Sequence, residues 1–190
     1  FIGLLRGSGL KGLISLDKKT TIKNVNLLRP LLDEQKKNLI FVAKHVFNFY
    51  VEDPTNEDEK FQRIKIRRFI KQLELNGLDE KKFLNTLNNL KHSNNVIGFY
   101  VKKNLRENSF FNYKKNQIIL NKNFFIQPQE IVFRAFSDCL KIIGKKYYSV
   151  RGKKVSMIID EITNNCLSKA TLGGCIVEKI EQTVILSKER

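Results

Sequence analysis

The chain has 190 residues, of which 42% are hydrophobic, and it carries a formal net charge of +16. This length and composition support one substantial core or two small domains. No apolar run approaches the ~18 residues of a membrane span, so we expect a soluble, cytoplasmic protein without a membrane partner. The three cysteines lack CxxC spacing and only two histidines are present, which argues against a zinc site or a disulfide framework. Because the sequence starts at Phe1 and its one methionine is Met157, we expect a piece of a longer protein.

The positive charge is concentrated in the middle of the chain. Residues 1–80 carry 15 bases and 11 acids, residues 81–154 carry 16 bases and 3 acids, and residues 155–190 carry 4 bases and 5 acids. A codon bias toward lysine would fill surfaces with bases, but it would not remove the acids from residues 81–154. The sequence therefore predicts a polyanionic partner, and a nucleic acid is the commonest polyanion.

The glycines near the start of the chain, Gly7 to Gly12, spell GxGxxG. A dinucleotide fingerprint also needs a preceding strand, a helix that opens from the turn and an acid about 20 residues on. The residues that follow Gly12 fit that pattern poorly. We predict instead a helix end, with Arg6 in the last turn and with Gly7 and Gly9 taking positive φ or permitting close backbone approach.

Residues 24–51 predict the tail end of a parallel α/β sheet. Residues 24–32 are typical of a short buried strand that ends at Pro30, and residues 49–51 of another. Between them, Asp33 is placed to cap a helix with an apolar i, i+3, i+4 period. The periodic residues are Leu39, Val42, Ala43, Val46 and Phe47. A strand, a helix and a strand in this order predict a βαβ crossover.

Residues 51–73 predict an amphipathic helix. Pro54 disfavours helix at Asp53, and Asn56 can accept free amide protons, so we expect the helix to begin near Asn56. Its cations recur at i, i+3, i+7 and i+11, at Lys60, Arg63, Arg67 and Lys71. Its apolar stripe is Ile66, Phe69, Ile70 and Leu73. Aligned cations repel one another unless an anion binds there, and a phosphate backbone is such an anion; a solvated basic face is the alternative.

The rest of the chain predicts a helical region that ends in strands. Asp79 is placed to cap a helix that breaks at residues 93–95 and then continues. A hairpin is expected around residues 114–116, further helices at residues 131–143 and from Val155, and a two-stranded antiparallel unit at residues 171–187. Cys139 lies on an apolar helix face and should be core. Aromatic residues interleaved with the bases could stack on unpaired nucleotides, although most should be core. They are Phe99, Tyr100, Phe110, Phe111, Tyr113, Tyr147 and Tyr148.

Three ordered motifs resemble the second half of the tRNA(Ile)-lysidine synthases. They are Leu4-Leu-Arg-Gly-Ser-Gly-Leu, Leu28-Arg-Pro-Leu-Leu and Val51-Glu-Asp-Pro-Thr-Asn with residues 63–68. The closing Thr171-Leu-Gly-Gly-Cys is similar to the C-terminal end of shorter bacterial members. The resemblance implies that residues 1–75 are the C-terminal part of an α/β ligase domain. It also implies that residues 76–190 are a basic, helical, tRNA-binding region with a terminal β hairpin.

The resemblance further implies an ATP-dependent ligase of the N-type PP-loop class, with ATP and Mg²⁺ as cofactors. In that reaction the first anticodon cytidine of an isoleucine tRNA, tRNA(Ile), is adenylated on its ring carbonyl, and the side-chain amine of L-lysine then displaces AMP. Arginines suit this chemistry because they can hold the negative charge that builds on oxygen. The catalytic residues implied by motif position are Arg6, Asp53, Arg63 and Arg67. Those implied for tRNA and nucleotide binding are Gly7, Gly9, Asn56, Lys60, Arg68 and Lys71.

The chain departs from the family in two ways. The SGGxDS pyrophosphate loop and the HHxDD segment of the family should both precede Phe1, so this chain alone is expected not to bind ATP productively. Where the family commonly has Arg-Asn-x-Ile-Arg, this chain has Arg63-Ile64-Lys65-Ile66-Arg67, so any role of that asparagine cannot be carried over.

Two other functions fit the same residues. A non-catalytic RNA-binding module explains the charge distribution equally well, and another tRNA-modifying enzyme, such as a thiolase, is the third alternative. The sequence upstream of Phe1 would separate them. An SGGxDS loop there would indicate the ligase, and CxxC pairs there would indicate the thiolase. The absence of both motifs would indicate the RNA-binding module.

Overall fold

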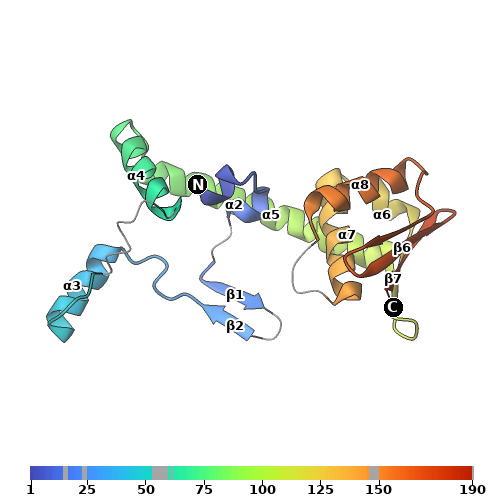
Figure 1. Ribbon diagram of the computed structural model, residues 1–190, viewed down its shortest axis with the longest axis horizontal. Helices are drawn as coiled ribbons and strands as arrows, with labels where there is room; N and C mark the ends of the chain where they lie inside the picture. The colour runs from blue at the N-terminus through green and yellow to red at the C-terminus, as the bar shows by residue number, and fades with distance from the viewer. Residues whose placement is uncertain (15–16, 23–24, 53–59, 61, 146–149, 190) are drawn as a thin grey trace. The chain divides into compact units, whose positions relative to one another are not determined.

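The computed structural model describes residues 1–14, 17–22, 25–52, 60, 62–145 and 150–189 (Figure 1). The chain divides into two compact units, unit 1 at Phe1–Asn94 and unit 2 at Asn95–Arg190. The fold is mixed α/β and mostly helical, and it ends in antiparallel strands. Among the helices that the structure describes, none combines the length and the apolar character needed to cross a membrane.

Unit 1 contains short helices and one two-stranded hairpin. Its elements are α1 (Ile2–Leu5), α2 (Leu10–Leu13), β1 (Lys19–Ile22), β2 (Val25–Leu28), α3 (Lys36–Phe47), α4 (Gln62–Leu75) and the first part of α5 (Glu80–Asn108). The two strands pair antiparallel, with Thr20 opposite Leu27. The Arg29 guanidinium donates hydrogen bonds to the Asp17 carbonyl (3.1 Å) and to the Thr20 hydroxyl (2.9 Å), which fastens the open end of the hairpin.

The predicted βαβ crossover is wrong in the described part of the chain. The strand expected at residues 24–32 is the shorter β2, which is exposed and pairs antiparallel with β1. Residues 49–51 are not a strand, and no parallel pair is found among the described strands. The physical reason is local, because β1 is the nearest segment in sequence and closing a short loop costs less entropy than a crossover.

The helix predicted after Asp33 is present as α3, but its surroundings differ from the expectation. Its N-cap residue is Gln35, and Asp33 forms an ion pair with Lys18 instead of capping the helix. Four of the five periodic apolar side chains, Leu39, Val42, Val46 and Phe47, are exposed, and Ala43 is half-buried. The period therefore identified the helix but not a covered face.

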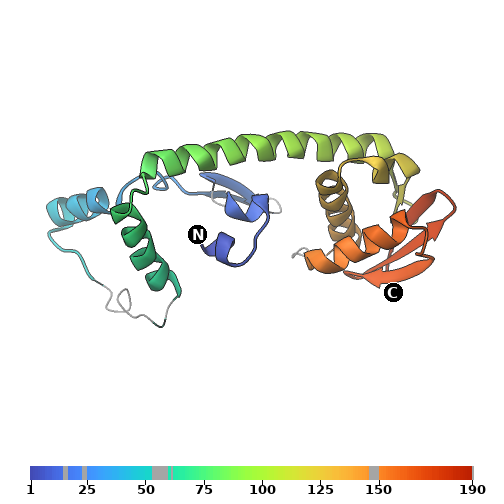
Figure 2. The same ribbon diagram turned by 90° about the horizontal axis from the view of Figure 1, so that it is seen from above.

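Helix α5 is a single unbroken helix of 29 residues (Figure 2). Asp79 caps it as predicted, because its carboxylate accepts the Lys82 amide proton at 3.0 Å. The break predicted at residues 93–95 is wrong. The Ser93 hydroxyl donates to the Asn89 carbonyl at 3.1 Å, so this polar side chain bonds back within the helix instead of competing with it.

Unit 2 is built on a five-stranded antiparallel sheet. The strands are β3 (Ser109–Asn112), β4 (Gln117–Leu120), β5 (Lys169–Leu172), β6 (Cys175–Ile180) and β7 (Thr183–Lys188), in the order β3-β4-β7-β6-β5. The predicted hairpin at residues 114–116 is confirmed as the β3–β4 pair. The terminal two-stranded unit is present as β6 and β7, but it belongs to this larger sheet.

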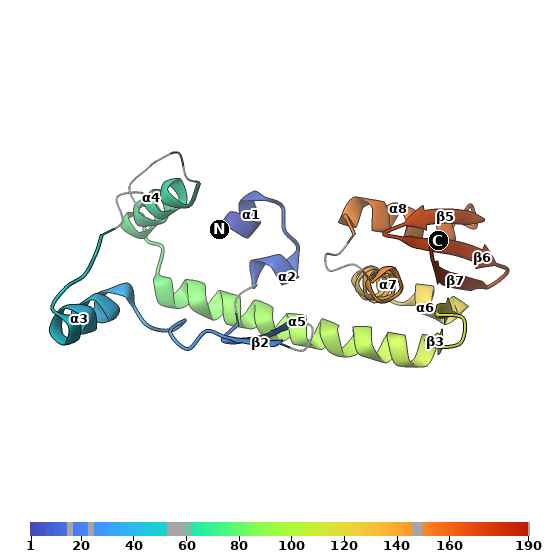
Figure 3. The ribbon, with the colours of Figure 1, turned by 60° about the horizontal axis from the view of Figure 1, so that its bottom comes forward.

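Helices α6 (Lys122–Ile126), α7 (Gln129–Gly144) and α8 (Gly152–Thr163) complete unit 2. The last two confirm the helices predicted at residues 131–143 and from Val155. They pack against the sheet (Figure 3) and bury an apolar stripe on α7. The buried residues of α7 are Ile131, Val132, Ala135, Phe136, Cys139, Leu140 and Ile143. Cys139 is core as predicted, and its burial, with a smaller effect of the Asp138 charge, raises the pKa of the thiol to about 12.

A buried polar pair fixes the end of α5 to α6. The Asn108 side-chain amide donates to the Asn104 side-chain oxygen at 2.8 Å, and the Asn104 amide donates to the Phe124 carbonyl at 3.2 Å. Each buried amide thus has a partner, which avoids the cost of about 1–3 kcal/mol for an unsatisfied group. These contacts fix the position of α6 relative to α5.

The C-terminal end of α7 lies directly against the β5–β6 turn. A Cβ atom added at Gly144 would lie 2.4 Å from the Gly173 carbonyl oxygen. Gly173 itself has φ of +68°, a backbone conformation that side chains disfavour, and a Cβ there would lie 2.5 Å from Val150. Glycine at position 144 therefore allows helix and turn to approach closely.

Gly144→Ala should destabilise the chain by roughly 1–3 kcal/mol, because the added methyl group must displace the turn backbone. Gly98 is a matched control, since it lies within α5 and a Cβ there would meet nothing within 4 Å. Gly98→Ala should stabilise the chain by ~0.5–1 kcal/mol through helix propensity. Urea unfolding followed by circular dichroism would measure both. The same sign of effect in the two variants would contradict the close-packed turn.

Candidate nucleic-acid interface

The predicted helix end at Arg6 is present. Helix α1 ends at Leu5, Arg6 is its exposed C-cap residue, and Gly7 has φ of +63°. Gly9 has φ of −66° and is the N-cap residue of α2, so the positive-φ expectation is confirmed for Gly7 alone. The Arg6 guanidinium is thus presented at a helix-to-helix turn.

The other glycines of this segment serve packing. A Cβ at Gly3 would lie 3.0 Å from the Gly12 carbonyl oxygen, and a Cβ at Gly12 would lie 2.6 Å from the Ser8 Cβ. Helices α1 and α2 therefore approach each other closely at Gly3 and Gly12, whereas a Cβ at Gly7 or Gly9 would meet nothing within 4 Å. The segment lacks the strand-to-helix geometry by which backbone amides cradle a pyrophosphate.

The cations of α4 are all exposed. Among the described residues, Arg63, Arg67 and Lys71 have no acidic partner. Lys60 and Arg68 are also exposed, and each has at least one interaction partner. Three of the four cations of the predicted face, Arg63, Arg67 and Lys71, are therefore exposed and have no acidic partner within the described ranges.

The apolar side of α4 agrees with the prediction only in part. Ile66 is 8% exposed and Phe69 is 50% exposed, so the predicted stripe is correct at the first position and wrong at the second. Ile64, which stands where the resembling family has asparagine, is also only 8% exposed. Sequence reasoning missed this residue as a packing position because it lies two residues from Ile66, outside the helical period.

Two predicted site residues, Asp53 and Asn56, lie outside the described residues, as does the predicted helix start near Asn56. The remaining ones fall on two elements of unit 1. Arg6, Gly7 and Gly9 belong to the α1–α2 turn, and the other residues belong to α4 or immediately precede it.

The exposed arginines of α4 have the chemistry to bind a phosphate. The α4 arginines suit phosphate oxygens because a guanidinium can donate two parallel hydrogen bonds. Within the described ranges, no group of three or more His, Cys, Asp or Glu residues is placed to hold a metal ion. Nor do those ranges contain a glycine turn between a strand and a helix.

Unit 2 carries most of the basic middle segment and several exposed aromatic rings. Phe110 is 64% exposed and Tyr113 is 84% exposed, and both flank the basic β3–β4 turn at Lys114 and Lys115. Phe111 instead packs against the core. Tyr147 and Tyr148 lie outside the described residues. Exposed rings beside lysines are typical of surfaces that bind single-stranded nucleic acid.

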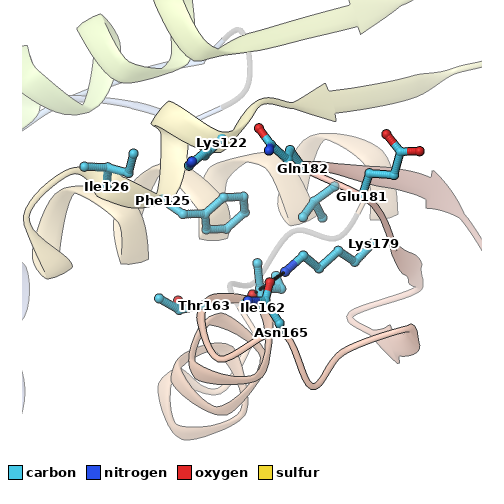
Figure 4. A pocket seen from close by; sticks show the side chains of 10 residues that line it. Lys122, Phe125, Ile126, Ile162, Thr163, Asn165, Lys179, Glu181 and Gln182 are labelled. Atoms are coloured by element: carbon cyan, nitrogen blue, oxygen red, sulfur yellow. Dashed lines mark hydrogen bonds between the residues drawn. The ribbon is translucent and has the colours of Figure 1, made fainter.

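A pocket of about 310 Å³ opens in unit 2 between α6, the end of α8 and the β6–β7 turn (Figure 4). Its lining residues are Lys122, Phe125, Ile126, Ile162, Thr163, Asn165, Lys179, Glu181, Gln182 and Val184. None of them was predicted as a site residue. They come from three separate segments, residues 122–126, 162–165 and 179–184, so no local spacing in the sequence could have indicated the pocket.

Comparison with known proteins gives two findings. Residues 1–74 match the family model described as PP-loop domain. The chain is also 24% identical over 193 residues to the tRNA(Ile)-lysidine synthase of Wolbachia sp. subsp. Brugia malayi, covering 98% of this chain and 43% of that protein. The enzyme of the same name from Orientia tsutsugamushi is 27% identical over 201 residues, covering 100% and 44%.

A third relative, the tRNA(Ile)-lysidine synthase of Bradyrhizobium diazoefficiens, is 35% identical over 94 residues, which are 50% of this chain and 26% of that protein. The chain therefore spans less than half the length of these relatives. The similarity to the first two nevertheless extends over nearly all of its residues. The chain is a homologue of the tRNA(Ile)-lysidine synthases, and its residues 1–74 match the PP-loop domain model.

Proposed function

We propose that the chain is the tRNA- and nucleotide-binding part of a cytoplasmic ligase that joins L-lysine to the anticodon of tRNA(Ile). The single observation that carries the proposal is the exposed cationic face of α4, which lies within the PP-loop match. Cations without acidic partners favour the binding of a phosphate-rich ligand. The similarity to lysidine synthases over nearly the whole chain supports this assignment.

In the proposed reaction, the cytidine ring carbonyl oxygen would take the adenylate of ATP with release of pyrophosphate, and the side-chain amine of L-lysine would then displace AMP. Arg63 and Arg67 would hold the negative charge that builds on phosphate and carbonyl oxygens, and Arg6 would lie beside the reacting phosphate. Asp53 and Asn56 would orient the nucleotide. The residues proposed for tRNA and nucleotide contacts are Gly7, Gly9, Lys60, Arg68 and Lys71. The PP-loop match implies the use of ATP. The use of Mg²⁺ stays a prediction, as does the division of the chain into a ligase part at residues 1–75 and a tRNA-binding part at residues 76–190.

A second candidate function is a non-catalytic RNA-binding module. It is favoured by unit 2, where the excess of bases, exposed rings and a folded core occur together. This candidate needs no ATP and no lysine. Lysine incorporation by the full-length protein therefore separates the two, because the module would bind tRNA without modifying it.

The affinity of the chain for tRNA should fall steeply with salt. If about six phosphates are neutralised, the affinity should decrease by ~10³ between 50 and 200 mM salt, because each contact releases condensed counterions. Fluorescence anisotropy with labelled tRNA at several salt concentrations would measure the slope. A flat dependence would reject an interface dominated by phosphate contacts.

Two matched double variants would locate these contacts. Lys114→Gln with Lys115→Gln should reduce the salt slope by roughly 2, since both bases lie in the acid-poor segment. Lys36→Gln with Lys37→Gln removes the same charge from exposed positions of α3, outside that segment, and should leave the slope unchanged. Equal effects of the two pairs would place the interface elsewhere.

In the full-length protein, Arg63→Ala should lower kcat/KM for lysine incorporation by ~10²-fold while changing the free energy of unfolding by less than about 0.5 kcal/mol. The reason is that an exposed cation contributes charge but little packing. Ile66→Ala should do the reverse and cost ~2–4 kcal/mol of stability, because it leaves a cavity under α4.

Lys65→Ala is the control for this pair, since Lys65 is an exposed base on the same helix but outside the predicted cationic face. Lys65→Ala should change neither kcat/KM for lysine incorporation nor the free energy of unfolding. Thermal unfolding and incorporation of labelled lysine would be measured on the same preparations. If Arg63→Ala and Ile66→Ala lose stability equally, the assignment of the two faces of α4 is wrong.

A further inference from the structure

We propose that the pocket of unit 2 binds one unpaired nucleotide of an RNA. The base would lie against the Phe125 ring, and a phosphate would lie beside Lys122 and Lys179. A volume of about 310 Å³ is at the small end of the range for ligand pockets, which suits a single nucleotide better than a longer segment. The proposal rests on the proposed function, because the nucleotide would belong to the tRNA that the chain binds.

The apolar wall of the pocket is preorganised for a flat ring. Phe125 is half-buried, and its ring centroid lies 5.1 Å from that of Phe124 and 6.2 Å from that of Phe136. Two aromatic neighbours restrict its rotation. Ile162 and Val184, both buried, complete the apolar surface. A base stacked on an aromatic side chain contributes about 1–3 kcal/mol to binding.

The two lysines lie on opposite walls (Figure 4). The Lys179 ammonium donates to the Ile162 carbonyl at 2.8 Å and to the Asn165 side-chain oxygen. Both acceptors are neutral, so the charge of Lys179 is held in place without being compensated. In the described part of the chain, neither Lys122 nor Lys179 pairs with a carboxylate. Such an arrangement favours an anionic group between the walls.

The polar rim can contact a base edge. Because the Asn165 oxygen accepts from Lys179, its NH₂ group is the end left to donate, so it would meet an acceptor on the base. Gln182 adds a second amide at the rim. The one acid of the lining, Glu181, is exposed, and its carboxylate points away from Lys179 in Figure 4. The lining of the pocket thus combines cations, side-chain amides and one aromatic ring, the groups by which proteins recognise an unpaired nucleotide.

The test compares two exposed lysines of unit 2 that differ in their relation to the pocket. Lys122 lines it, whereas Lys188 lies at the opposite end of β7 from the pocket residue Val184. In the 190-residue chain, Lys122→Glu should weaken binding of a labelled single-stranded RNA tetranucleotide by about 10-fold or more. Lys188→Glu, with the same change in charge, should weaken it less than about 3-fold. Fluorescence anisotropy at constant salt would measure both.

Phe125→Leu tests the ring, since it keeps an apolar side chain but removes the stacking surface. It should lower the affinity for the tetranucleotide by about 10-fold and leave the salt slope unchanged. Circular dichroism would verify that this variant folds. If it does not fold, photo-crosslinking of the unchanged chain to an RNA containing 4-thiouridine replaces it. The crosslink should map to residues 122–126 or 179–184.

Two further kinds of ligand test whether the pocket binds an unpaired nucleotide of an RNA or a free mononucleotide. A blunt RNA duplex should bind equally well to the unchanged chain and to Lys122→Glu, because it offers no unpaired base. Free CMP, UMP, GMP and AMP should bind more weakly than the tetranucleotide. Equal or tighter binding of a free mononucleotide would overturn the assignment to RNA.

The outcomes distinguish this proposal from the proposed function. If tRNA and the tetranucleotide bind the Lys122→Glu and Lys188→Glu chains with equal affinity, the pocket proposal is overturned while the proposed function stands. If the unchanged chain binds neither RNA, the tRNA-binding part of the proposed function fails, and the pocket proposal fails with it.

Discussion

The packing of α7 against the sheet is the interaction on which unit 2 depends. Helix α7 contacts the strands β4, β6 and β7 and the helices α6 and α8, so it joins the sheet to the other helices that follow it. Its end approaches the β5–β6 turn as closely as glycine allows. The walls of the pocket come from α6, α8 and β6, and each of these elements packs on α7. The pocket geometry is therefore a consequence of the core.

The sequence predicted the elements of unit 2 well because their signals are local and agree with their surroundings. The apolar period of α7 and the turn residues around Lys115 each specify a structure over a few residues. The full sheet could not be predicted in the same way. Its β4–β7 pairing joins residues such as Ile118 and Leu186, and no local pattern encodes contacts over that separation. A hairpin was therefore expected where a five-stranded sheet exists.

In unit 1, the helical period predicted where the helices lie but not which of their faces are buried. Helices α3 and α4 were predicted from their periods, yet Ile64 and Ile66 are the buried apolar side chains among the described residues of this unit. A helical period states which side chains share a face, but not whether another element covers that face. The same reasoning applies to the site. Spacing of i, i+3 and i+7 placed Arg63, Arg67 and Lys71 together, whereas the pocket required three-dimensional contacts between distant segments.

In unit 2 the charged side chains lie outside the apolar core, so substituting a charged residue can change ligand binding without changing stability. Among the described residues, the apolar cluster contains no ionised side chain, and the two buried polar residues, Asn104 and Asn108, hydrogen-bond to each other. The bases that line the pocket or flank the β3–β4 turn are exposed or half-buried. Removing an exposed base thus changes the field at the surface without leaving a cavity or an unpaired buried group. Lys179 is the exception, because its ammonium also donates a hydrogen bond to the end of α8. A substitution at Lys122 therefore tests ligand binding in the pocket with less effect on stability than one at Lys179.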